Sequence, residues 1–262
     1  MAHVLGLDIG SGYSKAVICE DKILRSFAVV PSGGDYKEAV RQVTETALGR
    51  ANLSFNDIVR TVSTGYGSSM VDFADHIATD IACHALGVYH LFPSVRTVVD
   101  IGAQFSKAIR VDEAGRATNF LLNEKCAGGS GKFLQIIARI LHITIDDIGA
   151  LSLTATKPVE FTTACAVFAE SEAVSRVAEG ALPADILAGI HKAMASKIVN
   201  LVTRVGLMPD CAVTGGGAKD SGLVKTIESE LASPVVVGDE PQITAALGAA
   251  LIGAEQAATT GR

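Results

Sequence analysis

Short apolar runs alternate with longer amphipathic stretches along this chain, and the order repeats once. Strand-length runs bounded by glycine, aspartate or charged turns come first in each half, and segments with a helical period follow. The predicted strands are His3–Leu7, Lys15–Cys19, Ile23–Val29, Ile58–Ser63, Thr97–Val99, Ile109–Val111, Thr118–Leu122, Val159–Thr162, Cys211–Thr214 and Val235–Val237. The predicted helices are Tyr36–Arg50, Val71–Leu91, Lys132–Leu141, Asp146–Leu151, Ala166–Ala178, Pro183–Val205, Ser221–Leu231 and Ile243–Ala254. This pattern is typical of an α/β protein.

One stretch occurs in both halves. DIGSGYSKAVI begins at Asp8 and DIGAQFSKAIR begins at Asp100, and the copies share Asp, Ile, Gly, Ser, Lys and Ala in the same register. The copies are too far apart for a solenoid repeat, and their separation suits two related half-domains. We therefore predict an N-terminal lobe of residues 1–93, completed by a C-terminal helix at 243–258, and a second lobe of residues 94–242.

The chemistry of the repeated stretch indicates an anion-binding hairpin. Glycine lets backbone amides approach a phosphate closely, and a carboxylate at a strand end can hold hydrated Mg²⁺. Two such hairpins that face each other would clamp a polyphosphate from both sides. The alternative is a pair of ordinary β-hairpins with glycine turns. The second copy and the glycine segment Gly215–Gly217 make that alternative the less favoured interpretation.

Composition excludes several classes of protein. The 262 residues are 48% hydrophobic and 19% charged, with a net charge of −6, so a sizeable core is available and nothing indicates nucleic-acid binding. No apolar run reaches the length of a membrane span, and a strand that begins at residue 3 leaves no room for a signal peptide. Five cysteines at irregular spacing argue against a disulfide framework. We expect a cytoplasmic protein.

The motifs follow one another in an order that resembles a known superfamily of nucleotide-binding proteins. DIGSG, a central helix, DIGAQ, VTGGG at Val213–Gly217 and the small-residue helix AALGAALIG together resemble the acetate kinase, sugar kinase, heat-shock chaperone and actin superfamily. The resemblance covers essentially the whole chain. It implies two ribonuclease H-like lobes, the actin-like ATPase fold, with a nucleotide cleft between them.

The resemblance also implies a binding site for ATP or ADP with Mg²⁺. Asp8, Asp100 and Gln104 are the implied catalytic residues, and the two aspartates would hold Mg²⁺ through water. The implied nucleotide contacts are Gly10, Ser11, Gly12, Tyr13, Ser14, Lys15, Gly102, Ala103, Gly128, Gly129, Gly131, Gly215, Gly216 and Gly217.

Two cysteine segments narrow the resemblance. KCAGGSGKFL at Lys125–Leu134 and TACAVFAESE at Thr163–Glu172 are similar to the activators of 2-hydroxyacyl-CoA dehydratases and the ATP-binding subunits of benzoyl-CoA reductases. In that family these two cysteines, here Cys126 and Cys165, bind half of a 4Fe–4S cluster that lies between two subunits. Each precedes a predicted helix, whose electropositive N-terminus suits an anionic cluster. The remaining residues, Cys19, Cys83 and Cys211, are more typical of small buried hydrophobes.

The second hairpin departs from the family pattern Asp-Ile-Gly-Gly-Gln-Asp. Ala103 replaces the second glycine and Phe105 replaces the final carboxylate. A similar drift resembles one of the two unequal ATP-binding subunits of benzoyl-CoA reductases, and the phrases IARIL, DIGALS and CAVFAE are also nearer that subunit. The departure leaves open whether this site hydrolyses ATP.

The favoured hypothesis is an ATP-hydrolysing electron-transfer subunit that drives low-potential electrons into a benzoyl-CoA reductase-type catalytic subunit. Its implied partners are a second copy or a sister ATPase subunit, and ferredoxin or flavodoxin as the electron donor. The first alternative is a homodimeric activator of a 2-hydroxyacyl-CoA dehydratase. Further alternatives are a sugar or carboxylate kinase of the same superfamily and a nucleotide-binding assembly subunit without turnover.

Overall fold

The computed structural model describes residues 2–123, 127–161 and 165–260, which fall into two compact units. Unit 1 comprises residues 1–94, 111–118 and 242–262, and unit 2 comprises residues 95–110 and 119–241. The described residues form two five-stranded sheets. Short 3-10 turns lie at Phe55–Asp57, Ser68–Met70, Ala127–Gly129, Gly216–Lys219 and Pro241–Ile243.

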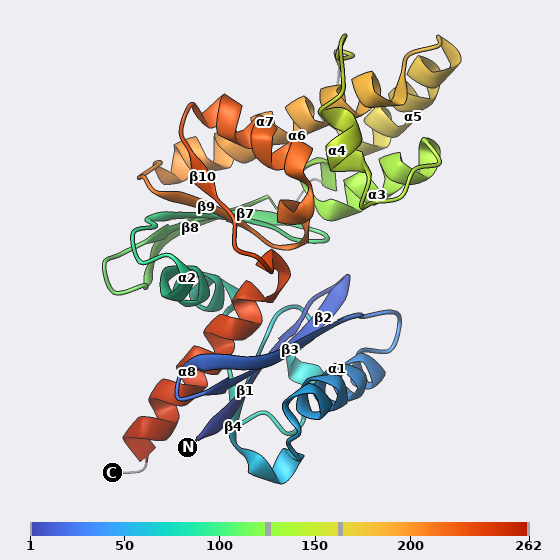
Figure 1. Cartoon of the computed structure of the whole chain (residues 1–262). Coiled ribbons are helices and arrows are strands. Elements are labelled where there is room, and N and C mark those ends of the chain that lie inside the picture. Colours follow the sequence, from blue (N-terminus) through green and yellow to red (C-terminus); the bar gives the residue numbers. More distant parts are fainter. Residues whose placement is uncertain (1, 124–126, 162–164, 261–262) are drawn as a thin grey trace. The chain divides into compact units, whose positions relative to one another are not determined.

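The sheet of unit 1 has the strand order β3-β2-β1-β4-β5 (Figure 1). Its strands are β1 (His3–Ile9), β2 (Tyr13–Glu20), β3 (Ile23–Pro31), β4 (Ile58–Thr64) and β5 (His76–Ile77). The central strand β1 pairs antiparallel with β2 and parallel with β4. Its side chains alternate, because Leu5 and Leu7 pack with helix α1 (Tyr36–Ala51) whereas Val4 packs with helix α8 (Thr244–Thr260). Each face of the sheet is therefore covered by one helix.

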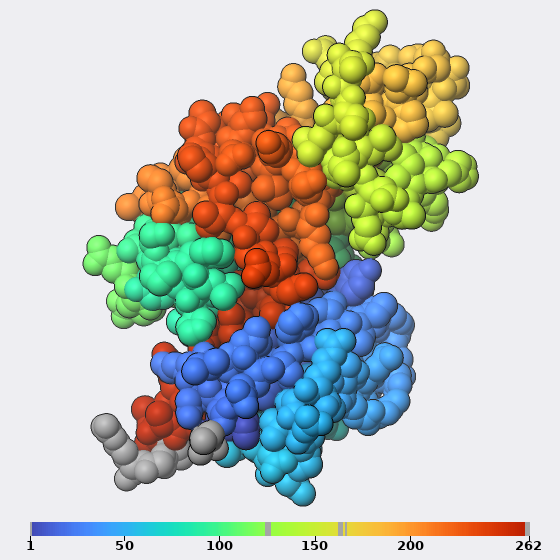
Figure 2. All heavy atoms as spheres, in the orientation of Figure 1, coloured from blue at the N-terminus to red at the C-terminus, as the bar shows by residue number. Residues whose placement is uncertain are grey.

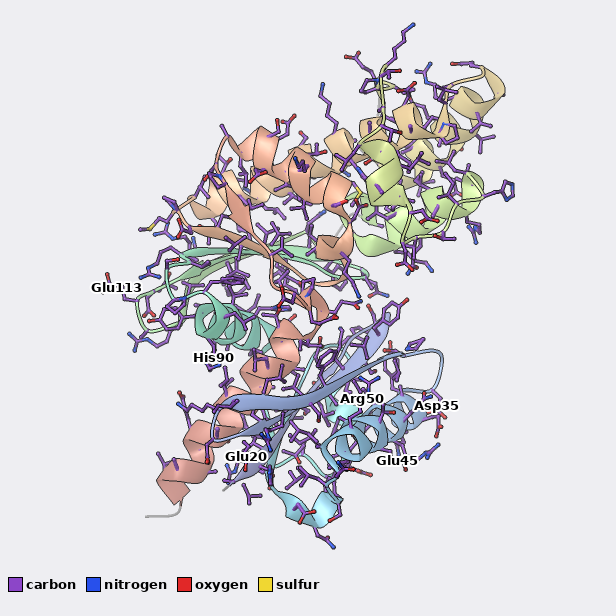
Figure 3. All side chains as sticks on the ribbon, viewed as in Figure 1. Glu20, Asp35, Glu45, Arg50, His90 and Glu113 are labelled. Carbon is purple, nitrogen blue, oxygen red and sulfur yellow. The ribbon has the colours of Figure 1, made fainter. Side chains whose placement is uncertain are left out.

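Helix α1 is amphipathic and capped at both ends. The carboxylate of Asp35 accepts hydrogen bonds from the amides of Lys37 and Glu38, and Asn52 ends the helix in the left-handed conformation at φ 55°. Arg50, labelled in Figure 3, lies in the last turn of the helix. Its guanidinium donates to the carbonyl of Phe27 at 2.6 Å. The apolar face consists of Ala39, Val40, Val43, Ala47 and Leu48.

Helix α2 (Asp80–Leu91) packs directly on α8 within unit 1. Two glycines allow this close approach. A side chain at Gly87 would collide with the carbonyl of Thr244, and one at Gly248 would collide with the carbonyl of Cys83. The small-residue pattern of the last helix is therefore a packing feature of unit 1.

Unit 2 repeats the sheet of unit 1 in the order β10-β9-β6-β7-β8. Its strands are β6 (Thr97–Ile101), β7 (Ser106–Val111), β8 (Ala117–Asn123), β9 (Cys211–Thr214) and β10 (Val235–Val236). As in unit 1, the central strand pairs antiparallel with the next strand of its hairpin and parallel with a later strand. Val99, Ile101 and Val213 pack in one core with helices α6 (Pro183–Val205) and α7 (Ser221–Leu231).

Three further helices of unit 2 are α3 (Gly131–Ile140), α4 (Ile148–Ser152) and α5 (Ala166–Ala178). Figure 2 shows them gathered at one end of the unit, in green to yellow. They join the core of the unit through Phe133, Ile137, Ile148, Ala169 and Ala173. The opposite side of α5 is apolar and exposed, with Val167 71% and Phe168 67% accessible. No helix among the described residues is long and apolar enough to cross a membrane.

One expected element begins later than predicted, and another is absent from its described residues. The helix predicted at Val71–Leu91 begins only at residue 80, because Asp75 instead accepts from the amide of Thr61 and β5 pairs with β4. Thr79 caps the shortened helix by accepting from the amide of Ala82. The strand predicted at Val159–Thr162 is absent from its described residues, 159–161, where Val159 donates to the carbonyl of Asp185. At the first place residues 75–77 bond to β4 and so lie outside the helix, and at the second Val159 bonds to a residue of helix α6 rather than to a strand.

Candidate functional site

The first hairpin of the repeat, Asp8–Lys15 (hairpin 1), is built around a partly buried ion pair. Asp8 in β1 lies opposite Lys15 in β2, and Lys15 Nζ is 2.8 Å from Asp8 Oδ2. The amide of Gly10 donates to the carbonyl of Tyr13 at 3.1 Å and closes the turn. A Cβ atom at Gly10 would lie 2.7 Å from that carbonyl and 2.9 Å from Lys15 Nζ. Position 10 therefore requires glycine, because the backbone there passes close to the ammonium group of Lys15.

Ser32, directly after β3, holds the turn of hairpin 1 from behind. Its amide donates to the carbonyl of Gly12 at 3.0 Å, and its hydroxyl lies 2.6 Å from the carbonyl of Gly10. The buried hydroxyl of Ser14 lies 2.9 Å from the Ser32 hydroxyl. These bonds engage two carbonyl oxygens that would otherwise repel an anion near the turn.

The second hairpin, Asp100–Lys107 (hairpin 2), repeats the ion pair in unit 2. Lys107 Nζ is 2.9 Å from Asp100 Oδ2, and the side chains are 10% and 4% exposed. The amide of Gly102 donates to the carbonyl of Phe105 at 2.9 Å, as in the first turn. Lys107 was not among the residues identified from the sequence. The signal was present, because Lys107 occupies the same place in its copy of the repeat as Lys15.

The N-terminus of α3 holds hairpin 2. The amide of Gly131 donates to the carbonyl of Gly102, and the amide of Lys132 donates to the carbonyl of Ala103, both at 2.9 Å. Gly129 lies behind the hairpin, where a Cβ atom would be 3.2 Å from Ser106 Oγ. Gly128 and Gly129 are buried. The structure thus places the glycines of this segment beside hairpin 2, and their contact with nucleotide stays a prediction.

A glycine loop covers the aspartate of each hairpin. Gly215 has φ +81° and Gly65 has φ +88°, and a side chain at either would collide with Oδ1 of Asp100 or Asp8 respectively. The loops read T-G-x-G in both units, at Thr64–Gly67 and Thr214–Gly217. Only the second was recognised from the sequence as a ligand-binding loop. The first could have been found from the shared pattern after a buried strand.

The structure brings the sequence-predicted site residues together within each unit. Asp8, Gly10, Ser11, Gly12, Tyr13, Ser14 and Lys15 form hairpin 1, whereas Asp100, Gly102, Ala103, Gln104 and Gly215–Gly217 lie at hairpin 2 and its loop. Carboxylate oxygens beside glycine turns, with little room for any side chain, fit a hydrated Mg²⁺ ion and a polyphosphate.

The cysteines separate into two kinds. Cys19, Cys83 and Cys211 are buried, and desolvation raises the pKa of each thiol to about 12. Such thiols stay protonated near neutral pH and are poor metal ligands. Cys165 is partly exposed at the N-cap of α5. Cys126 lies outside the described residues, among which no group of three or more His, Cys, Asp or Glu side chains could hold a metal.

Comparison with known families matches residues 5–253 to the BadF/BadG/BcrA/BcrD ATPase family. The chain belongs to this family. The activator of lactoyl-CoA dehydratase from Anaerotignum propionicum is 40% identical over 97% of this chain and 98% of the relative. One of the subunits of benzoyl-CoA reductase from Thauera aromatica is 35% identical over 97% of this chain and 94% of the relative.

Solved structures place this member of the ATPase family in the same fold. The activator of the 2-hydroxyisocaproyl-CoA dehydratase from Clostridium difficile, solved with bound ADPNP, matches with a TM-score of 0.95 and 37% identity. The match covers 99% of this chain and 97% of that one. The expected fold class, the α/β actin-like ATPase fold, is therefore confirmed.

Proposed function

We propose that this chain is the ATP-hydrolysing activator of a 2-hydroxyacyl-CoA dehydratase. The supporting observation is its full-length similarity to such activators, with 40% identity to the lactoyl-CoA dehydratase activator against 35% to the benzoyl-CoA reductase relative. The sequence favoured a benzoyl-CoA reductase, largely because of Ala103 and Phe105. These comparisons favour the dehydratase activator, which was the first alternative. Substitutions at two positions of one hairpin are weaker evidence than sequence identity along the whole chain.

The nucleotide part of the proposal rests on the twin hairpins. Mg²⁺ would be held through water by Asp8 and Asp100, and the turns at Gly10–Gly12 and Gly102–Ala103 would face the phosphates. Gly215 and Gly216 would flank the adenosine. Hairpin 2 has Phe105 in place of a carboxylate. We therefore assign the neighbouring Gln104 side chain the role of positioning the water that attacks ATP.

The electron-transfer part rests on the cysteines. We assign Cys126 and Cys165 to a 4Fe–4S cluster shared with a second copy of the chain. Such a cluster would supply a low-potential electron, received from ferredoxin or flavodoxin and passed to the dehydratase. Support comes from Cys165, which is partly exposed at a helix N-terminus, unlike the three buried thiols. The exposed apolar residues of α5 next to it suit a subunit interface.

The experiment uses protein purified without oxygen. We expect a brown protein with broad absorption near ~400 nm, typical of thiolate-bound iron clusters. Cys126→Ser and Cys165→Ser should lose the iron and the absorption but still bind Mg·ADP. Cys19→Ala is the matched control, because its thiol is buried in β2, and it should keep the iron. A Cys165→Ser variant that retains full iron and sulfide would contradict the assignment.

An ATP-binding subunit of a benzoyl-CoA reductase remains the second candidate, favoured by the hairpin 2 sequence and the 35% identity to the Thauera aromatica relative. The two candidate functions predict different oligomers of this chain. An activator should form a homodimer that hydrolyses ATP by itself, whereas an unequal reductase subunit should need a sister chain. Ultracentrifugation and an ATPase assay of the purified chain distinguish them. Binding of Mg·ADP without any turnover would instead support an assembly subunit.

A further inference from the structure

The T-G-x-G loops of the two units run into the same backbone turn but end it with different residues. In unit 1 the amide of Met70 donates to the carbonyl of Gly67 at 2.9 Å. In unit 2 the amide of Asp220 donates to the carbonyl of Gly217 at 3.2 Å, at the matching place. Met70 is 44% exposed, whereas Asp220 is buried. The turn therefore closes in unit 1 without a carboxylate at this position.

In unit 2 the Asp220 side chain joins the loop to two helices. Its Oδ1 accepts from the amide of Leu223 at 2.9 Å and so caps α7. Its Oδ2 lies 2.9 Å from Nε2 of His191 on α6, which packs beside α7 (Figure 1). The side chains of His191 and Asp220 are 1% and 5% exposed, and these two atoms have no other hydrogen-bond partner in the described part of the chain. Each buried polar group is therefore compensated by the other.

We propose that His191 is a positioning residue for the nucleotide, which holds Asp220 on α6 and thereby fixes the end of the loop that flanks the adenosine. This inference rests on the proposed function, which places Gly215 and Gly216 beside the adenosine. The 3-10 turn Gly216–Lys219 directly precedes Asp220, so a shift of Asp220 away from α6 moves the loop. A loop that is already fixed before the ligand binds loses less entropy on binding, which raises the affinity.

The test compares Mg·ADP with Mg·pyrophosphate, which has the phosphates without the adenosine. Both are titrated by calorimetry into the full chain. His191→Leu keeps a side chain of similar size in the core but leaves the Asp220 carboxylate without its partner. Mg·ADP should bind about tenfold more weakly, as expected for one lost charge-assisted contact. The affinity for Mg·pyrophosphate should not change, because the loop is assigned to the adenosine alone.

A double variant separates positioning from stability. In His191→Leu with Asp220→Asn the uncompensated charge is removed, and asparagine still caps α7. Denaturant unfolding should show that this variant regains much of the stability lost by His191→Leu. Its affinity for Mg·ADP should stay about tenfold low, because nothing holds residue 220 on α6. The double variant carries the test if His191→Leu does not fold.

The matched control is Met194→Ala, because Met194 is fully buried on the same helix, α6. It should lose stability but keep both affinities. Equal weakening of the two ligands in His191→Leu, or recovery of Mg·ADP binding together with stability in the double variant, would overturn the positioning role. A wild-type chain that binds neither ligand would instead overturn the proposed nucleotide site itself.

Discussion

The two hairpins share their charged pair and their glycine cover but differ in what holds them. Hairpin 1 is tied to its own sheet, because Ser32, directly after β3, donates to the carbonyls of Gly10 and Gly12. Hairpin 2 is tied instead to the N-terminus of α3, through the amides of Gly131 and Lys132. Hairpin 1 is thus held by a residue next to its own sheet, and hairpin 2 is held by a helix.

The difference gives the hairpins different roles in the proposed function. The first described turn after Cys126 is Ala127–Gly129, which leads directly into α3, and α3 packs against α5 in the core of unit 2. Any shift of hairpin 2 on nucleotide binding therefore acts on the start of α3, and through its packing on α5. Hairpin 1 has no such connection among the bonds described, so we expect it to bind phosphate without transmitting motion.

The largest expected effect comes from the glycines that cover the aspartates. Gly215→Ala places a Cβ atom against Asp100 Oδ1 at a φ of +81°, and should lower the free energy of unfolding by about 3 kcal/mol and abolish Mg·ADP binding. Gly65→Ala should do the same through Asp8. Gly180→Ala is the control, because Gly180 has φ +86° and open space around its Cβ position, so only the backbone cost of about 1 kcal/mol applies. Denaturant unfolding and calorimetry provide the measurements.

Normal nucleotide binding by only one of these two glycine variants would show that the hairpins of the two units are not equivalent. If Gly65→Ala leaves Mg·ADP binding intact while Gly215→Ala abolishes it, the two covered aspartates are not functional equivalents. The metal would then be held by unit 2 alone.

A smaller effect is expected where α3 meets hairpin 2. Gly131 is the first residue of α3, where proline is tolerated, and Ser130 before it has φ −123° and ψ 160°, which suits a following proline. Gly131→Pro removes the amide that donates to the carbonyl of Gly102 and places its ring Cδ against that oxygen, so hairpin 2 must shift, whereas Gly131→Ala keeps the bond with a Cβ contact of 3.4 Å. We expect Gly131→Pro to weaken Mg·ADP about fivefold to tenfold, and Gly131→Ala to change it little.

Hydrogen exchange decides whether that bond also transmits motion. In wild type and Gly131→Ala, adding Mg·ADP should change the exchange of amides in α5. In Gly131→Pro that response should be lost while the protection of α6 stays unchanged. Equal responses in the two variants would show that α3 supports hairpin 2 without coupling it to α5.

Much of the fold follows from the sequence because the hairpins are local. Both central strands and their aspartates were identified from one repeated motif, and the register that pairs Asp8 with Lys15 and Asp100 with Lys107 is set within it. Long-range features did not follow. The start of the helix predicted from Val71 was wrong because β5 at His76–Ile77 pairs with β4 before the helix begins, and an apolar period cannot reveal such a partner.

The site was predictable to the same extent. Asp8, Lys15 and Asp100 were named from the repeat as candidate site residues, although their ion pairs were not foreseen, and Lys107 was missed because the second copy was not followed to its last residues. The contacts that hold the two hairpins were not predictable, since Ser32 and Gly131 donate hydrogen bonds to backbone carbonyls of the turns. Such bonds depend on where separate segments meet in the fold, and no residue type marks them in the sequence.

The smallest expected effect concerns the brace of hairpin 1. Ser32→Ala removes the hydroxyl that bonds the carbonyl of Gly10, so the free energy of unfolding should fall by about 1 kcal/mol and Mg·ADP binding should weaken severalfold. Ser26→Ala is the matched control in the same sheet, because its buried hydroxyl donates to the carbonyl of Ala47 at 2.8 Å, away from the turn. It should lose similar stability yet bind nucleotide normally. Because hairpin 1 is braced locally, exchange in α5 should respond to Mg·ADP in Ser32→Ala as in wild type. A lost response there would mean that both hairpins transmit motion.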